Sequence, residues 1–193
     1  MGILKVYTDA TASSLQDFQG AACIIQYEDS DTLLLFSKEL EFPKGDMLSL
    51  TTELEAVKMA AKRIRQTIQK YGLKDITHIK FHTDNSGVEF SLKEAFNANS
   101  NAKKKGRNPL MKDAAKAMKK QMAKLPFGLK PSMSVHHSNR DTALIPLADK
   151  IGNITGKHGI NFRGSGLSVS DLDDFLDGEY PKTADLLIDN PSI

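Results

Sequence analysis

Residues 6–11 read VYTDAT, an apolar run that ends at the carboxylate of Asp9. Residues 79–86, IKFHTDNS, repeat this arrangement, with a second apolar run that ends at Asp84. Two further acids lie in helical patterns, Glu53 in TTELEAV and Asp149 in PLADKI. Strand ends and helix faces from distant parts of a chain can meet in a fold. We therefore expect these four carboxylates to lie together.

The order of the elements outward from these motifs indicates the fold class. The opening strands form hairpins, which implies antiparallel pairing, and later crossovers through helices imply parallel pairing. We therefore predict an α/β domain over residues 1–155, with a mixed five-stranded sheet and helices on both of its faces. The expected strands are residues 3–8, 20–27, 32–42, 76–83 and 133–137, and the expected helices are residues 51–71, 87–96, 109–124 and 143–154.

Beyond residue 155 the composition changes. Residues 156–166 are rich in glycine and predict a linker, and residues 167–193 hold seven acids against Lys182. We predict that residues 156–193 are a Gly-rich linker and an acidic C-terminal tail. Two interpretations of the tail stay open: a disordered solubilising end, or a segment that folds over a basic surface of the same chain.

The single cysteine and the absence of a long apolar run limit the class of protein. Cys23 lies in an apolar stretch, so an internal disulfide is excluded and a reducing compartment is favoured. No apolar run approaches the roughly 20 residues that span a bilayer, and the N-terminus lacks a signal-peptide pattern. We expect a cytoplasmic protein without a membrane partner.

A group of unpaired carboxylates predicts bound cations. Neighbouring carboxylates repel one another, and hard divalent ions prefer oxygen ligands. The four acids therefore predict a site for two Mg²⁺ ions, with Mn²⁺ as a possible substitute, which would support two-metal phosphoryl chemistry. The alternative is that the acids are ordinary strand-end turns and helix caps.

Together the motifs resemble the ribonuclease H family: a strand-end Asp, Glu-Leu-x-Ala-Val at a helix start, a strand-end Thr-Asp and an Ala-Asp on a late helix. The resemblance covers roughly residues 1–155. It implies a ribonuclease H-like fold and an endonuclease that hydrolyses the RNA strand of RNA–DNA hybrids. It further implies that Asp9 and Asp84 hold both metal ions, with Glu53 completing the first site and Asp149 the second.

The resemblance also implies a catalytic histidine on a loop before the last helix. Residues 136–139, HHSN, occupy that region, and His137 is the better candidate because it lies nearer the loop. The alternative is that His136 and His137 simply end a strand.

Charge along the chain is sorted, which indicates a partner. Residues 103–124 hold nine basic residues and one acid, a net +8, so with a total of +2 the remaining chain carries −6. The start of this window resembles the basic protrusion of the family and predicts a nucleic-acid-binding surface, most of all for an RNA–DNA hybrid. The residues predicted to bind nucleic acid are Lys103, Lys104, Lys105, Arg107, Asn108 and Ser86.

The sequence departs from the family where ribose 2′-hydroxyls are recognised. Asparagines that precede the helix Glu in the family are Ser49, Leu50 and Thr51 here, and Ser86 stands where a Gln often follows the second Asp. Two alternatives therefore stay open: a nuclease of the same fold that acts on structured RNA or branched DNA, and a non-catalytic nucleic-acid-binding module.

Overall fold

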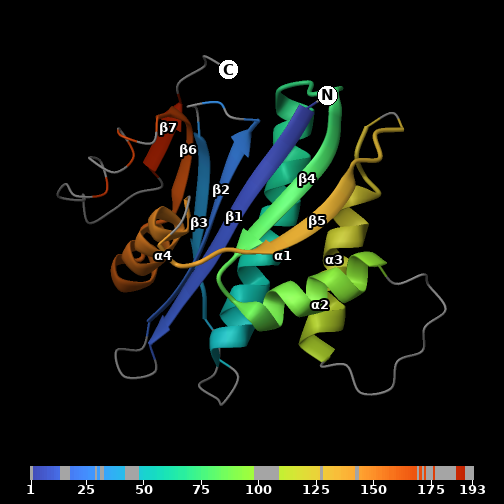
Figure 1. The fold of residues 1–193 in the computed structure, drawn as a ribbon. Coiled ribbons are helices and arrows are strands. Elements are labelled where there is room, and N and C mark those ends of the chain that lie inside the picture. Colours follow the sequence, from blue (N-terminus) through green and yellow to red (C-terminus); the bar gives the residue numbers. More distant parts are fainter. Residues whose placement is uncertain are drawn as a thin grey trace.

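A mixed sheet of seven strands in the order β5-β4-β1-β2-β3-β6-β7 forms the centre of the molecule (Figure 1). In this computed structural model the described residues are 2–13, 18–28, 30, 33–41, 48–97, 109–126, 128–141, 144–168, 170, 172, 176 and 186–189. The mixed sheet that the sequence predicts is confirmed, and two further strands extend it beyond the expected five.

The five expected strands lie where the sequence pattern places them. β1 (Gly2–Ser13), β2 (Phe18–Tyr27) and β3 (Leu33–Glu39) form an antiparallel meander. β4 (Ile76–Thr83) pairs parallel to β1, and β5 (Ser132–His137) pairs parallel to β4. The parallel pairing brings the carboxyl ends of β1 and β4 to the same edge of the sheet.

The prediction of a linker over residues 156–166 is wrong at both of its ends: residues 156–158 belong to the last helix, and residues 162–166 belong to a strand. β6 (Phe162–Leu167) pairs antiparallel with β3, and β7 (Leu186–Asp189) pairs parallel with β6. The cause is burial: the Phe162 side chain is fully buried, and its backbone N–H donates to the buried Ser37 hydroxyl at 2.8 Å. This strand is hard to recognise from the sequence, because its glycines contribute no side chains to an apolar pattern. The division of the chain at residue 155 stays a prediction, and most of the acidic tail lies outside the described residues.

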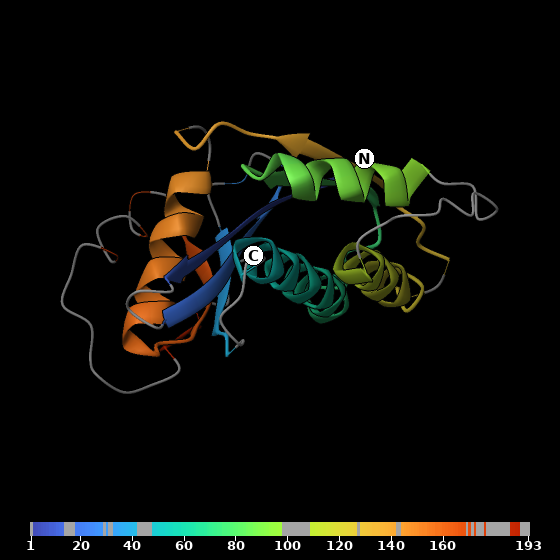
Figure 2. The ribbon, with the colours of Figure 1, turned by 90° about the horizontal axis from the view of Figure 1, so that it is seen from below.

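Helices cover both faces of the sheet, as predicted (Figure 2). α1 (Leu48–Lys70), α2 (Ser86–Asn97) and α3 (Pro109–Met122) share one apolar core with the sheet. α4 (Ile145–His158) packs on the opposite face over a second core. In the part of the chain that the structure describes, no helix has the length and apolar character to cross a bilayer.

α4 approaches the sheet unusually closely because glycines line the contact. A Cβ atom added to Gly20 of β2 would lie 2.0 Å from the carbonyl oxygen of Gly152 and 2.7 Å from the backbone nitrogen of Gly156. Glycine is therefore required at residue 20, since any side chain would push the helix away. This backbone contact fixes the height of α4 above β2, and with it the place of Asp149 one turn earlier on the helix.

Candidate active site

Three carboxylates meet where the parallel pairing of β1 with β4 stops. Asp84 directly follows β4, as expected, but the expectation that a strand ends at Asp9 is wrong, because β1 continues to Ser13 in its pairing with β2. The last paired residues of the two strands are Tyr7 and His82, so Asp9 and Asp84 each lie two residues beyond that pair. Glu53 joins them from the N-terminal part of α1, which packs against β1. One carboxylate oxygen from each of the three acids lies within 4.8 Å of the others. The structure thus brings together three of the four acids that the sequence singles out.

Burial and the repulsion of neighbouring charges raise the pKa of two of these acids, Asp9 and Glu53. Burial and, next, the charges of Asp84 and Asp149 raise the pKa of Asp9 from 3.8 to about 7. Burial and, next, the charges of Asp9 and Asp84 raise the pKa of Glu53 from 4.5 to about 9. Without a bound cation the group therefore carries less negative charge near neutral pH than its three acids would carry in water.

The donor set fits a hard divalent cation. Asp9 and Glu53 are only 4% and 5% exposed, and Glu53 Oε2 is buried without a hydrogen-bond partner among the described residues. A buried oxygen without a donor is costly, and a cation bound between the three carboxylates would satisfy it. Carboxylate oxygens are also the ligands that Mg²⁺ and Mn²⁺ prefer.

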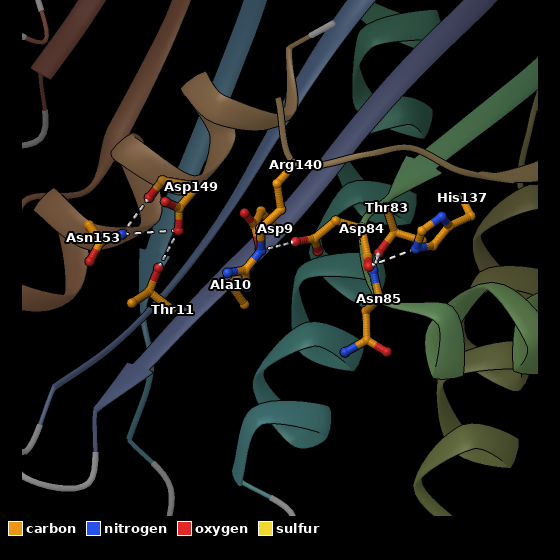
Figure 3. A network of polar contacts seen from close by, with 10 residues as sticks. All are labelled: Asp9, Ala10, Thr11, Thr83, Asp84, Asn85, His137, Arg140, Asp149 and Asn153. Carbon is orange, nitrogen blue, oxygen red and sulfur yellow. Dashed lines mark hydrogen bonds and ion pairs between the residues drawn. The ribbon is translucent and has the colours of Figure 1, made fainter. Parts of the chain in front are cut away.

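Asp149 lies beside this group rather than within it. Its Oδ1 accepts hydrogen bonds from Thr11 Oγ1 at 3.1 Å and from Asn153 Nδ2 at 3.0 Å. Figure 3 shows Asp149 on α4, on the far side of Asp9 from Asp84. Its charge still contributes to the raised pKa of Asp9. Asp149, Asp9 and Asp84 thus form a row in which Asp149 is the separate member, and the metal-binding role of Asp149 stays a prediction.

His137 is the nearer of the two histidines to the carboxylates. Its ring Nε2 hydrogen-bonds the backbone oxygen of Asp84 at 3.0 Å, and its backbone N–H donates to Glu89 at 3.1 Å. His136 instead stacks on His82, with ring centroids 5.4 Å apart, and contacts Ser134. The ring of His137 is therefore held at the site, and its catalytic role stays a prediction.

Sequence reasoning missed Arg140, which lies between β5 and α4. Its Nε donates to Asp84 Oδ2 at 2.6 Å, and Figure 3 shows this ion pair beside Asp9. The charge of Arg140 also opposes the rise in pKa at Asp9 and Glu53. One signal was present in the sequence: Arg140 stands in the short loop between two candidate site residues, His137 and Asp149.

The predicted nucleic-acid-binding residues are only partly described. Ser86 is exposed at the first position of α2, where the Asn85 side chain accepts hydrogen bonds from the backbone N–H groups of Gly87 and Val88 at 3.0 and 3.1 Å. Asn85 therefore caps the helix, which leaves the Ser86 hydroxyl out of that role. Lys103, Lys104, Lys105, Arg107 and Asn108 lie outside the described residues.

Comparisons with known proteins concern the fold alone. No protein-family model matches the chain, and no curated protein matches it. Many solved structures resemble it, and three of them, all at low sequence identity, illustrate the likeness.

The first, LC11-RNase H1 in complex with an RNA/DNA hybrid, has 17% identity and a TM-score of 0.54, over 72% of this chain and 86% of that one. The second is the N-terminal RNase H domain of rv2228c from Mycobacterium tuberculosis, with 10% identity and a TM-score of 0.52, over 90% and 96%. The third, LC9-RNase H1, has 11% identity and a TM-score of 0.52, over 91% and 81%. The agreement spans most of each chain, and we conclude that this protein has a ribonuclease H-like fold.

Proposed function

We propose that this protein is a metal-dependent endonuclease that hydrolyses the RNA strand of RNA–DNA hybrids. The observation that carries the proposal is the group formed by Asp9, Glu53 and Asp84, three acids within 4.8 Å of one another on a ribonuclease H-like fold. Such a group is costly in a folded protein unless it binds cations. A structural neighbour of the same fold is an RNase H in complex with an RNA/DNA hybrid, which supports this choice of substrate.

The chain's own residues would hold two Mg²⁺ ions, with Mn²⁺ as a substitute. Asp9, Glu53 and Asp84 would bind one ion, and Asp149 with Asp9 would bind the other. When bound, the ions supply a water nucleophile and neutralise the charge of the leaving oxygen.

Several contacts of the described residues pre-orient these ligands. The backbone N–H of Ala10 donates to Asp9 Oδ1 at 2.7 Å. Thr11 and Asn153 hold Asp149 in the same way. Partners of this kind reduce the freedom of a ligand before the metal arrives.

His137 is proposed to move a proton at the same site. A neutral imidazole that donates from Nε2 to the Asp84 carbonyl keeps Nδ1 as an acceptor. Nδ1 would take a proton from the attacking water or return one to the leaving oxygen.

The nucleic acid is proposed to bind to the basic segment, together with Ser86. The residues of this segment are Lys103, Lys104, Lys105, Arg107 and Asn108. A cytoplasmic location is proposed because Cys23 is a buried free thiol.

A second candidate is a nuclease of the same fold that acts on another nucleic acid. The observation that favours it lies at the start of α1: Ser49 is exposed and Thr51 partly buried, within one turn of Glu53. Hydroxyls replace the family's amides here, so recognition of the ribose 2′-hydroxyl would differ. A non-catalytic binding module is the third candidate, and the grouping of three acids, two of them buried, counts against it.

The test is cleavage of strand-labelled substrates with Mg²⁺ or Mn²⁺. An RNA–DNA hybrid, an RNA duplex, a DNA duplex and a branched DNA would be compared, each with wild type, Asp84→Asn and Asp113→Asn. Asp113 is an exposed acid of α3 that pairs with Lys58 and serves as the matched control. The proposal expects cleavage of only the RNA strand of the hybrid, lost in Asp84→Asn and kept in Asp113→Asn. Preference for another substrate would support the second candidate, and binding without cleavage the third.

A further inference from the structure

The carboxylate group already holds a positive charge of its own, the guanidinium of Arg140. The Arg140 Nε to Asp84 Oδ2 distance of 2.6 Å is that of a strong charge-assisted hydrogen bond. The charges of Asp84, Asp9 and Asp149 all raise the pKa of Arg140, after its hydrogen bond to Asp84. Arg140 therefore interacts with the whole row of acids and not with Asp84 alone.

The two partners differ in how freely they can leave this contact. The Asp84 side chain is 7% exposed, whereas the Arg140 side chain is 85% exposed. Arg140 also stands in the segment between β5 and α4, where no helix or strand holds it. Asp84 is thus fixed, and Arg140 can move to another anion at little cost in packing.

A guanidinium on Asp84 Oδ2 and a metal ion on the same oxygen compete for one position. Two cations close to one carboxylate oxygen repel each other. A phosphate group is the natural alternative partner, since arginine binds phosphate with parallel N–H groups.

We propose that Arg140 is an internal counter-cation of the metal site, which a metal ion displaces from Asp84 and which then binds a backbone phosphate of the nucleic acid. This inference rests on the proposed function, because it needs a metal at the three acids and a nucleic acid beside them. Arg140 is in this sense a positioning residue: it couples the two ligands. The nucleic acid draws Arg140 away and so favours the metal, and by linkage the metal favours the nucleic acid to the same degree.

The experiment measures Mg²⁺ affinity rather than activity. Thermal unfolding of the full chain would be followed over a series of Mg²⁺ concentrations, without nucleic acid and with a hybrid whose RNA strand carries 2′-fluoro groups to prevent cleavage. Wild type, Arg140→Gln and the matched control Arg163→Gln would be compared. Arg163 is an exposed arginine of β6, and β2 and β3 separate this strand from β1, which carries Asp9.

Without nucleic acid, Arg140→Gln should bind Mg²⁺ about tenfold more tightly than wild type, since one hydrogen bond between charged groups no longer has to be broken. The hybrid should tighten Mg²⁺ binding of wild type, and this tightening should be about tenfold smaller in Arg140→Gln. Arg163→Gln should behave as wild type in both conditions.

Each failure has its own meaning. If Arg140→Gln binds Mg²⁺ with wild-type or lower affinity while wild type cleaves the natural hybrid, the inference is overturned and the proposed function stands. If the hybrid tightens Mg²⁺ binding equally in both proteins, the coupling role of Arg140 is likewise overturned. If neither protein binds Mg²⁺, the proposed function fails and takes the inference with it.

Discussion

Replacing Glu53 by glutamine should stabilise the metal-free protein, although it removes a predicted metal ligand. The Glu53 side chain is buried beside Asp9 and Asp84, and its pKa is raised from 4.5 to about 9. At neutral pH the folded protein therefore keeps a proton on a carboxyl group that the unfolded chain would release. Glutamine has nearly the same shape and no charge, so the amide avoids this cost and can donate to the neighbouring carboxylates.

The magnitude follows from the shift itself. A group with a raised pKa in the folded state contributes stability at low pH, and that contribution is lost as the pH rises toward the folded pKa. Above the unfolded pKa of 4.5 the loss is about 1.4 kcal/mol for each pH unit. Glu53→Gln should therefore exceed wild type by about 3 kcal/mol in free energy of unfolding near pH 7, and by less than about 1 kcal/mol near pH 5.

Urea denaturation in the presence of EDTA, at several values between about pH 5 and about pH 8, measures this difference. Glu55→Gln is the matched control, because Glu55 lies two residues along α1 and pairs with Lys58 at a partly exposed site. The control should show no gain that grows with pH. In Mg²⁺ the advantage of Glu53→Gln in free energy of unfolding should shrink, since metal binding stabilises wild type more than the variant.

Two results would refute the reasoning. Equal stability of Glu53→Gln and wild type near pH 8 in EDTA would mean that Glu53 carries no electrostatic cost. A gain of the same size at pH 5 and pH 8 would mean that the effect comes from packing and not from the proton.

Three further changes probe what holds the site. Gly20→Ala should lower the free energy of unfolding by about 3 kcal/mol in urea denaturation, since its Cβ would meet the α4 backbone. Gly152→Ala is the control and should be nearly neutral, because its Cβ would make only ordinary contacts of 3.4 Å or more. An equal loss in both variants would show that the close approach at Gly20 is not what matters. Thr11→Val removes the hydroxyl that donates to Asp149 and should reduce the cleavage rate about tenfold with little change in stability; an unchanged rate would show that Asp149 needs no such support. Ser37→Ala removes the acceptor of two buried donors and should cost about 2 kcal/mol in urea denaturation, and a loss below about 0.5 kcal/mol would show that water replaces the hydroxyl.

Much of the fold was predictable from the sequence because its signals are local. The strand that carries Asp9 and the helix that carries Glu53 each show their hydrophobic period within a few residues, and the order of elements then limits the topology. β6 was not predictable in this way. Its glycines add nothing to the apolar pattern of the sequence. The burial of Phe162 depends on tertiary contacts, because its side chain packs in the core under α4 and its backbone N–H donates to Ser37.

In the candidate site, too, some features follow from local sequence patterns and others depend on tertiary contacts. The meeting of Asp9 and Asp84 follows from parallel pairing of two strands, since each acid stands two residues after the last pair. The displacement of Asp149 toward Thr11 depends on how α4 sits on β2, and that height is set by a contact between glycine backbones. The ion pair of Arg140 joins two loops, and no periodicity in a sequence reports such a contact.

The glycine contact between α4 and β2 has a consequence for motion. At this contact no rotatable side chain separates Gly20 from the backbone of Gly152 and Gly156, so the helix cannot move closer to the strand. Asp149 should therefore fluctuate together with the sheet that carries Asp9, as parts of one body. Arg140 and His137 lie in or beside the segment that links β5 to α4. Of the residues at the site, Arg140 therefore combines an exposed side chain with a place in a loop, while His137 is held by β5 and by its contact with Asp84.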